Sequence, residues 1–115
     1  MGQLTTHVLD TAHGRPAAGV AVRLFSLGEK RALVSSQLTN QDGRTDGPLL
    51  DGTAMAAGSY ELEFDIGDYF AANDVKVSEP AFLNTVVIRF AVNADEHYHV
   101  PLLASPWSYS TYRGS

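Results

Sequence analysis

The chain has 115 residues, 44% of them hydrophobic and 18% charged, a composition that fits one globular domain spanning residues 1–115. Thirteen acidic and eight basic residues give a net charge of −5 with no cluster of Lys or Arg, so a small molecule is a better candidate partner than nucleic acid or an anionic membrane. The absence of cysteine excludes disulfides, thiolate nucleophiles and thiolate metal sites.

The chain as given starts without a basic segment followed by an apolar run. It also contains no apolar stretch approaching the length of about eighteen residues that a membrane-spanning helix needs. We therefore expect no membrane partner and a cytoplasmic location.

Apolar and polar residues alternate in short blocks, which is the period-two pattern of strands with one buried face. In the first half of the chain this pattern predicts strands at 4–10, 20–25 and 32–39 and a short piece at 49–53. Turn-forming residues at 13–16 and 40–43 separate them. These segments are typical of a β protein.

The second half continues the pattern with strands at 59–66, 86–92, 97–104 and 107–113. One short helix is predicted at 67–73, with Asp68 able to cap it. About eight strands at this spacing, joined by turns, predict an all-β sandwich or barrel.

Two histidines in the predicted strand 97–104 are candidates for chemistry. Residues i and i+2 of a strand share a face, so His97 and His99 project from the same side. With His7 as a third ligand they could bind zinc, or they could be surface histidines of a strand. In the strand 4–10, Val8 suits the core, which turns His7 outward toward solvent or another subunit.

Arg44 follows Asp42 and Gly43 in a tight turn, which presents the long cation rather than burying it. It is either a solvated surface charge or a group that orients a planar, carbonyl-rich substrate through its paired donors. Arg113 near the end of the chain has the same two interpretations. No nucleophile elbow or serine triad is visible, so histidine-assisted attack by water is the chemistry that remains.

The last residues, Tyr112, Arg113, Gly114 and Ser115, stay polar and aromatic to the end of the chain. Chain ends without packing or site duty tend toward disorder, so this composition indicates an ordered terminus that serves a site.

Six motifs together resemble the transthyretin-related 5-hydroxyisourate hydrolases, in the same order along the whole chain. They lie at 7–10, 14–17, 42–44, 67–70, 97–103 and 109–115. The terminal Tyr-Arg-Gly-Ser is the most specific of them, because it separates these hydrolases from the transthyretin hormone carriers that share the fold.

The resemblance implies two four-stranded sheets with one short helix, assembled as a homotetramer in which two subunits build each site. It implies hydrolysis of 5-hydroxyisourate to 2-oxo-4-hydroxy-4-carboxy-5-ureidoimidazoline in urate degradation, with neither metal nor cofactor. Catalytic roles would fall on His7, Arg44, His99 and Ser115, and substrate binding on Tyr112, Arg113 and Gly114. The alternative is a transthyretin-like small-molecule carrier without catalysis.

Overall fold

The computed structural model describes residues 2–114 and confirms the predicted all-β class. Within these residues the chain forms two sheets, one α-helix and one short 3₁₀ helix. The elements are, in order, β1 (Gln3–Asp10), β2 (Arg15–Pro16), β3 (Ala21–Leu27), β4 (Arg31–Leu38), β5 (Leu50–Asp51), η1 (Gly52–Ala54), β6 (Gly58–Asp65), α1 (Ile66–Ala72), β7 (Thr85–Val92), β8 (Tyr98–Ala104) and β9 (Tyr109–Thr111).

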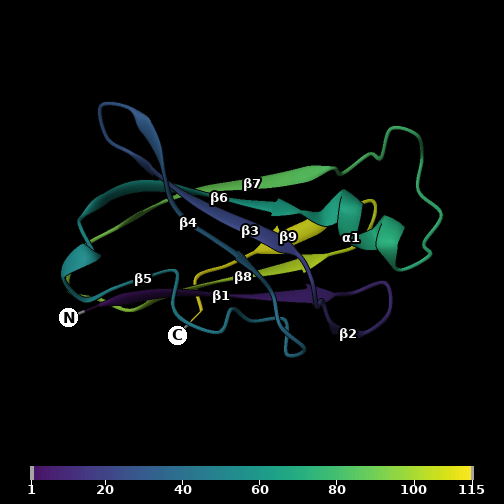
Figure 1. Ribbon diagram of the computed structural model, residues 1–115, viewed down its shortest axis with the longest axis horizontal. Coiled ribbons are helices and arrows are strands. Elements are labelled where there is room, and N and C mark those ends of the chain that lie inside the picture. Colours follow the sequence, from purple (N-terminus) through teal and green to yellow (C-terminus); the bar gives the residue numbers. More distant parts are fainter. Residues whose placement is uncertain (1, 115) are drawn as a thin grey trace.

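The two sheets form the layers of a sandwich (Figure 1). The first has the strand order β2-β1-β8-β9, and the second has the order β4-β3-β6-β7. The predicted pair of four-stranded sheets is therefore present, and the two-residue strand β5 adds a further partner to β1 in the first of them. The pair β1 and β8 is parallel, which brings the start and the end of the chain side by side.

The core lies between the sheets and follows the alternation read from the sequence. Leu4 and Val8 of β1 face it with no exposed surface, and Leu62 and Phe64 of β6 meet them from the second sheet. Burial of such side chains stabilises the fold by about 1.5 to 3 kcal/mol each. Leu102 of β8 is equally buried, so alternate residues of the two central strands of the first sheet are turned away from the core.

The outward face of the second sheet carries a network of ion pairs. Glu61 of β6 belongs to the polar half of the alternation, yet it is only 7% exposed. The guanidinium groups of Arg31 and Arg89 cover it at 3.0 and 2.8 Å. Arg23 pairs in the same way with Glu63 and with Asp65 of the same strand. The carboxylates of β6 on this face are consequently paired with guanidinium groups.

The predicted helix exists, but the predicted cap is wrong. Helix α1 begins at Ile66, directly after β6, so Asp68 lies inside the first turn instead of preceding it. Asp65 occupies the cap position and makes no capping hydrogen bond, because its carboxylate accepts hydrogen bonds from Arg23 and Thr85. No helix within residues 2–114 is long and apolar enough to cross a membrane.

The end of β1 is anchored to α1 through a buried carboxylate. Asp10 is 2% exposed and accepts hydrogen bonds from the Tyr69 hydroxyl at 2.7 Å and from the backbone amide of His13 at 2.9 Å. Its second contact with His13 is to the ring Nδ1, at 2.6 Å. Burial would raise the pKa of Asp10, but these hydrogen bonds outweigh it and lower the pKa below the ordinary value. The β1 strand that bears His7 is thereby held at its far end.

Candidate functional site

The two outward-facing histidines come together because β1 and β8 are neighbours in the first sheet. The register pairs Thr5 with His99 and His7 with Pro101. His7 and His99 are both half-buried, as expected from their place opposite the core-facing residues of their strands. Their ring centroids are 6.4 Å apart. The prediction that alternation turns His7 away from the core is confirmed.

Arg44 reaches the same face on a segment that runs beside β1. The amide of Val8 donates to the Gly43 carbonyl at 2.7 Å, and the amide of Leu49 donates to the Leu4 carbonyl at 2.8 Å. Between these two contacts, Arg44 lies opposite His7 in an isolated antiparallel bridge. The segment therefore delivers a guanidinium to the histidine pair.

The turn that precedes Arg44 is fixed by Asn40 and Gly43. The Asn40 side chain accepts hydrogen bonds from the amides of Asp42 and Arg44, at 2.9 and 3.2 Å. Gly43 has a φ of +74°, and a Cβ atom there would lie 2.4 Å from the Val8 carbonyl oxygen. Only glycine permits both this backbone conformation and this close approach to β1.

The positive charge of Arg44 acts on both imidazoles. Burial lowers the pKa of His99, and Arg44 and His7 lower it further. Burial and Arg44 also lower the pKa of His7, although the backbone and charge of Asp42 oppose them. Both rings are therefore neutral at pH 7, the state in which an imidazole nitrogen can accept a proton.

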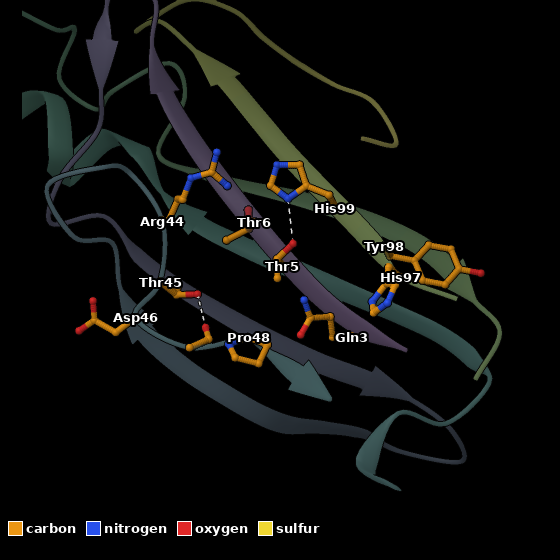
Figure 2. Close-up of a pocket in the computed structure, with 11 residues that line it drawn as sticks. Gln3, Thr5, Thr6, Arg44, Thr45, Asp46, Pro48, His97, Tyr98 and His99 are labelled. Carbon is orange, nitrogen blue, oxygen red and sulfur yellow. Dashed lines mark hydrogen bonds between the residues drawn. The ribbon is translucent and has the colours of Figure 1, made fainter. Parts of the chain in front are cut away.

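A pocket of about 710 Å³ opens beside this group. Its walls come from β1 and β8 and from the segment that contains Arg44 (Figure 2). The lining residues are Gln3, Thr5, Thr6, Arg44, Thr45, Asp46, Gly47, Pro48, His97, Tyr98 and His99. Nearly all of them offer polar groups, which suits a small substrate rich in carbonyl and N–H groups.

The C-terminal segment reaches His99. Gly114 pairs with His99 in an isolated bridge, and its amide donates to the His99 carbonyl at 2.7 Å. A Cβ atom on Gly114 would lie 2.7 Å from Cδ2 of the His99 ring. The glycine of the terminal motif therefore packs directly against the imidazole, while Tyr112 is 60% exposed.

Arg113 is placed differently from the other predicted site residues. Its guanidinium carbon lies 4.2 Å from the centroid of the Tyr98 ring, a cation–π contact. It also donates to the carbonyl of His97 at 3.2 Å and to Glu96 at 3.4 Å. The structure thus brings together His7, Arg44, His99 and Gly114 and directs Arg113 to another set of partners. Ser115 lies outside the described residues.

The zinc alternative has no cluster to support it in the part of the chain that the structure describes. Within residues 2–114, no group of three or more His, Cys, Asp or Glu side chains could hold a metal ion. His97 is exposed and lines the pocket.

Sequence reasoning missed Thr5, Thr45 and Asp46. Thr5 shares a face with His7 by strand alternation, so the same argument could have selected it. Thr45 and Asp46 had no such signal, because they follow the turn in a segment whose course only the tertiary structure defines.

Comparison with known proteins links this arrangement to one family. Residues 4–114 match the family described as the HIUase/Transthyretin family. The 5-hydroxyisourate hydrolase 2 of Rhizobium meliloti is 58% identical, over 99% of this chain and 97% of the relative. The 5-hydroxyisourate hydrolase of Pseudomonas aeruginosa is 55% identical, over 100% of this chain and 93% of the relative.

Solved structures agree with the sequence comparison. The 5-hydroxyisourate hydrolase of Klebsiella pneumoniae has a TM-score of 0.83 and 33% identity, with both chains fully covered. A transthyretin from Sparus aurata has a TM-score of 0.86 and 25% identity, over 97% of this chain and 96% of its own. An (S)-allantoin synthase matches at a TM-score of 0.95 and 49% identity over 99% of this chain, which spans only 44% of that larger protein.

The matched residues extend over nearly the whole chain, and they include the two histidine strands, the arginine turn and the terminal glycine. The chain belongs to the HIUase/Transthyretin family.

Proposed function

We propose that this protein is a 5-hydroxyisourate hydrolase of urate degradation, which opens the ring of its substrate with water to give 2-oxo-4-hydroxy-4-carboxy-5-ureidoimidazoline. The observation that carries this proposal is the convergence of His7, Arg44 and His99 on one sheet face, in a chain that is 58% identical to a hydrolase of that name. The enzyme is a cyclic amide hydrolase.

The reaction begins with a neutral imidazole. His99, together with His7, takes a proton from water, and the water oxygen forms a bond to the ring carbonyl carbon beside a ring nitrogen. The developing negative charge on the carbonyl oxygen is stabilised by the guanidinium of Arg44. The carbon–nitrogen bond then breaks, and the proton held by imidazole passes to the leaving nitrogen. The remaining proton of water stays with the new carboxyl group.

The terminal motif encloses the substrate in this proposal. Gly114 holds the chain end against His99 through the bridge between them, and this placement supports a role for the end of the chain at the site. Tyr112, whose side chain is largely exposed, is available to contact substrate or a second subunit. Substrate binding by Arg113 and catalysis by Ser115 stay predictions.

We further propose a homotetramer in which two subunits complete each site. Its support is the outer face of the first sheet, where Leu9 and Leu103 share the face of the histidines and are only partly covered. The strands β7 and β9 also end their sheets with free edges within the described residues, and edges of this kind pair readily with another chain. The cytoplasmic location stays a prediction.

The alternative of a transthyretin-like carrier explains less of the site. A carrier pocket needs shape and apolar contacts, whereas this pocket is bordered by imidazole, guanidinium, amide and hydroxyl groups. Two neutral imidazoles beside a fixed cation are the groups that a hydrolysis needs.

The decisive assay generates 5-hydroxyisourate freshly and follows its ultraviolet absorbance with and without the purified protein. We expect acceleration well above the spontaneous decay, and a loss of about a hundredfold or more in kcat for His99→Asn, the range expected for a general base. Decay at the spontaneous rate with folded wild-type protein would overturn the function. Full activity in His99→Asn would overturn the role of His99 alone.

A further inference from the structure

Thr5 is in direct contact with the imidazole of His99, although nothing in the proposed reaction uses it. Its Oγ1 lies 2.8 Å from His99 Nδ1, and the two residues are register partners on β1 and β8 (Figure 2). Within residues 2–114 this is the ring's one hydrogen bond. The hydroxyl is therefore the polar partner that the fold supplies to this imidazole.

The other edge of the ring is also occupied. Nδ1 and Cδ2 are the two atoms next to Cγ, and they lie on opposite edges of the imidazole. Nδ1 faces Thr5, whereas Cδ2 faces the backbone of Gly114, where an added Cβ would be only 2.7 Å away. The end of the ring that carries Nε2 is the part left for a substrate or a water molecule.

We propose that Thr5 is a positioning residue for His99: its hydroxyl binds Nδ1, fixes the ring between β1 and Gly114, and directs Nε2 to the reacting water. This inference deepens the proposed function and rests on it.

A hydroxyl suits this task because it can both donate and accept a hydrogen bond. In the proposed role it accepts a hydrogen bond from Nδ1–H of the neutral ring, which leaves Nε2 free to take a proton from water, and it keeps that hydrogen bond when the ring becomes imidazolium. The hydrogen bond at one ring nitrogen determines which nitrogen is free to react. A carboxylate in the place of Thr5 would raise the pKa of the ring and favour imidazolium before the reaction, and an alkyl group would leave Nδ1–H without a partner.

Other charged and titratable groups around His99 also influence the protonation of its ring. Arg44 approaches from the segment beside β1, His7 lies along β1, and His97 is two residues away, just before β8 begins. Gly114, from the chain end, adds none. Because Arg44 and His7 both disfavour a charged ring, the Thr5 hydroxyl is the neighbour that favours imidazolium.

The test compares Thr5→Val, which keeps the branched shape without the hydroxyl, with Thr5→Ser, which keeps the hydroxyl. We expect kcat to fall about tenfold or more in Thr5→Val with little change in KM, and Thr5→Ser to recover to within about threefold of wild type. Thr85→Val makes the same chemical change on β7 of the other sheet, and we expect it to retain wild-type activity. Equal activity of Thr5→Val and wild type would overturn the proposal.

A second readout does not depend on turnover. In nitrogen-15 NMR of the ring, we expect one dominant His99 tautomer in the wild type and a mixture of tautomers in Thr5→Val. We also expect His99 to titrate at a lower pH in Thr5→Val than in the wild type, because the imidazolium loses its hydrogen-bond acceptor. Unchanged tautomer populations and midpoint would overturn the proposal even if activity fell. If the wild type were inactive on 5-hydroxyisourate while the tautomer shift appeared, the function would fail and the orientation of His99 by Thr5 would stand.

Discussion

At the scale of single residues, the site depends on keeping two histidines uncharged next to a cation. Partial burial and the guanidinium of Arg44 lower the pKa of both rings from the ordinary value of 6.5. A lowered pKa leaves the basic form of imidazole dominant at neutral pH, at the cost of a weaker base. Arg44 therefore lowers the pKa of His7 and His99, in addition to the role on the substrate that we propose for it.

This coupling predicts the pH dependence of the enzyme. Protonation abolishes the base, so kcat/KM should be constant near neutral pH and fall as pH decreases, with a midpoint below pH 6.5. Removing the cation in Arg44→Gln should raise the pKa of both rings and move the midpoint to higher pH. The measurement is kcat/KM from about pH 4.5 to 8, corrected for spontaneous decay. A midpoint that stayed in place or moved lower in Arg44→Gln would contradict the electrostatic role.

At the scale of elements, the site is assembled by three segments that are distant in sequence. Strands β1 and β8 contribute the histidines through their parallel pairing, and the segment after the turn at residues 40–43 contributes Arg44. Gly43 determines how closely that segment approaches β1, since its carbonyl accepts the Val8 amide and its α-carbon faces the Val8 carbonyl. The histidine strands and the arginine turn are thus coupled through one backbone contact.

The substitution Gly43→Ala should push the arginine segment away from Val8 of β1. The new methyl group would meet the Val8 carbonyl oxygen, so we expect the free energy of unfolding to fall by about 2 to 4 kcal/mol. We also expect kcat/KM to fall, because Arg44 moves with the segment. Urea unfolding and the ultraviolet assay measure the two effects.

Gly14→Ala is the matched control for this variant. Gly14 also has a positive φ, of +69°, but nothing lies within 4 Å of an added Cβ. It should lose only the conformational cost of about 1 to 2 kcal/mol and keep its kcat/KM. If both variants lost equal stability and kept full activity, the contact between Gly43 and Val8 would not position Arg44.

At the scale of the whole molecule, the two sheet faces have different surfaces. The outer face of the second sheet carries the ion pairs of Arg23, Arg31 and Arg89 with carboxylates of β6. It also exposes Leu33 of β4 and Val87 of β7. The outer face of the first sheet carries His7 and His99 on the same strands as the partly covered Leu9 and Leu103. We propose that assembly uses the face of the first sheet, because that face bears the residues of the proposed site.

We therefore expect a tetramer of about 50 kDa, four times the 12.4 kDa of one chain, in sedimentation velocity. Specific activity should fall on dilution below the concentration at which the tetramer dissociates, because each site would lose its second subunit. His99→Asn should sediment like the wild type. A monomer with undiminished activity would contradict assembly as a requirement for catalysis.

Much of the fold followed from local patterns. Alternation located the strands that contain Val8, Leu62 and Leu102, because a strand with one buried face must repeat every two residues. It also turned His7 away from the core. The predicted start of α1 was wrong by one residue, and the predicted cap was wrong by three. Asp65, which occupies the cap position, forms its hydrogen bonds with Arg23 on a neighbouring strand, and no local pattern reveals that contact.

The sequence by itself determined the all-β class, the outward orientation of His7 and, through its motifs, the family resemblance. Only the tertiary structure decided that β1 pairs in parallel with β8, that Arg44 lies opposite His7, and that Thr5 and Gly114 border the His99 ring. The physical reason is range: alternation depends on neighbours along one strand, whereas these contacts join residues up to 94 positions apart through hydrogen bonds and packing between strands.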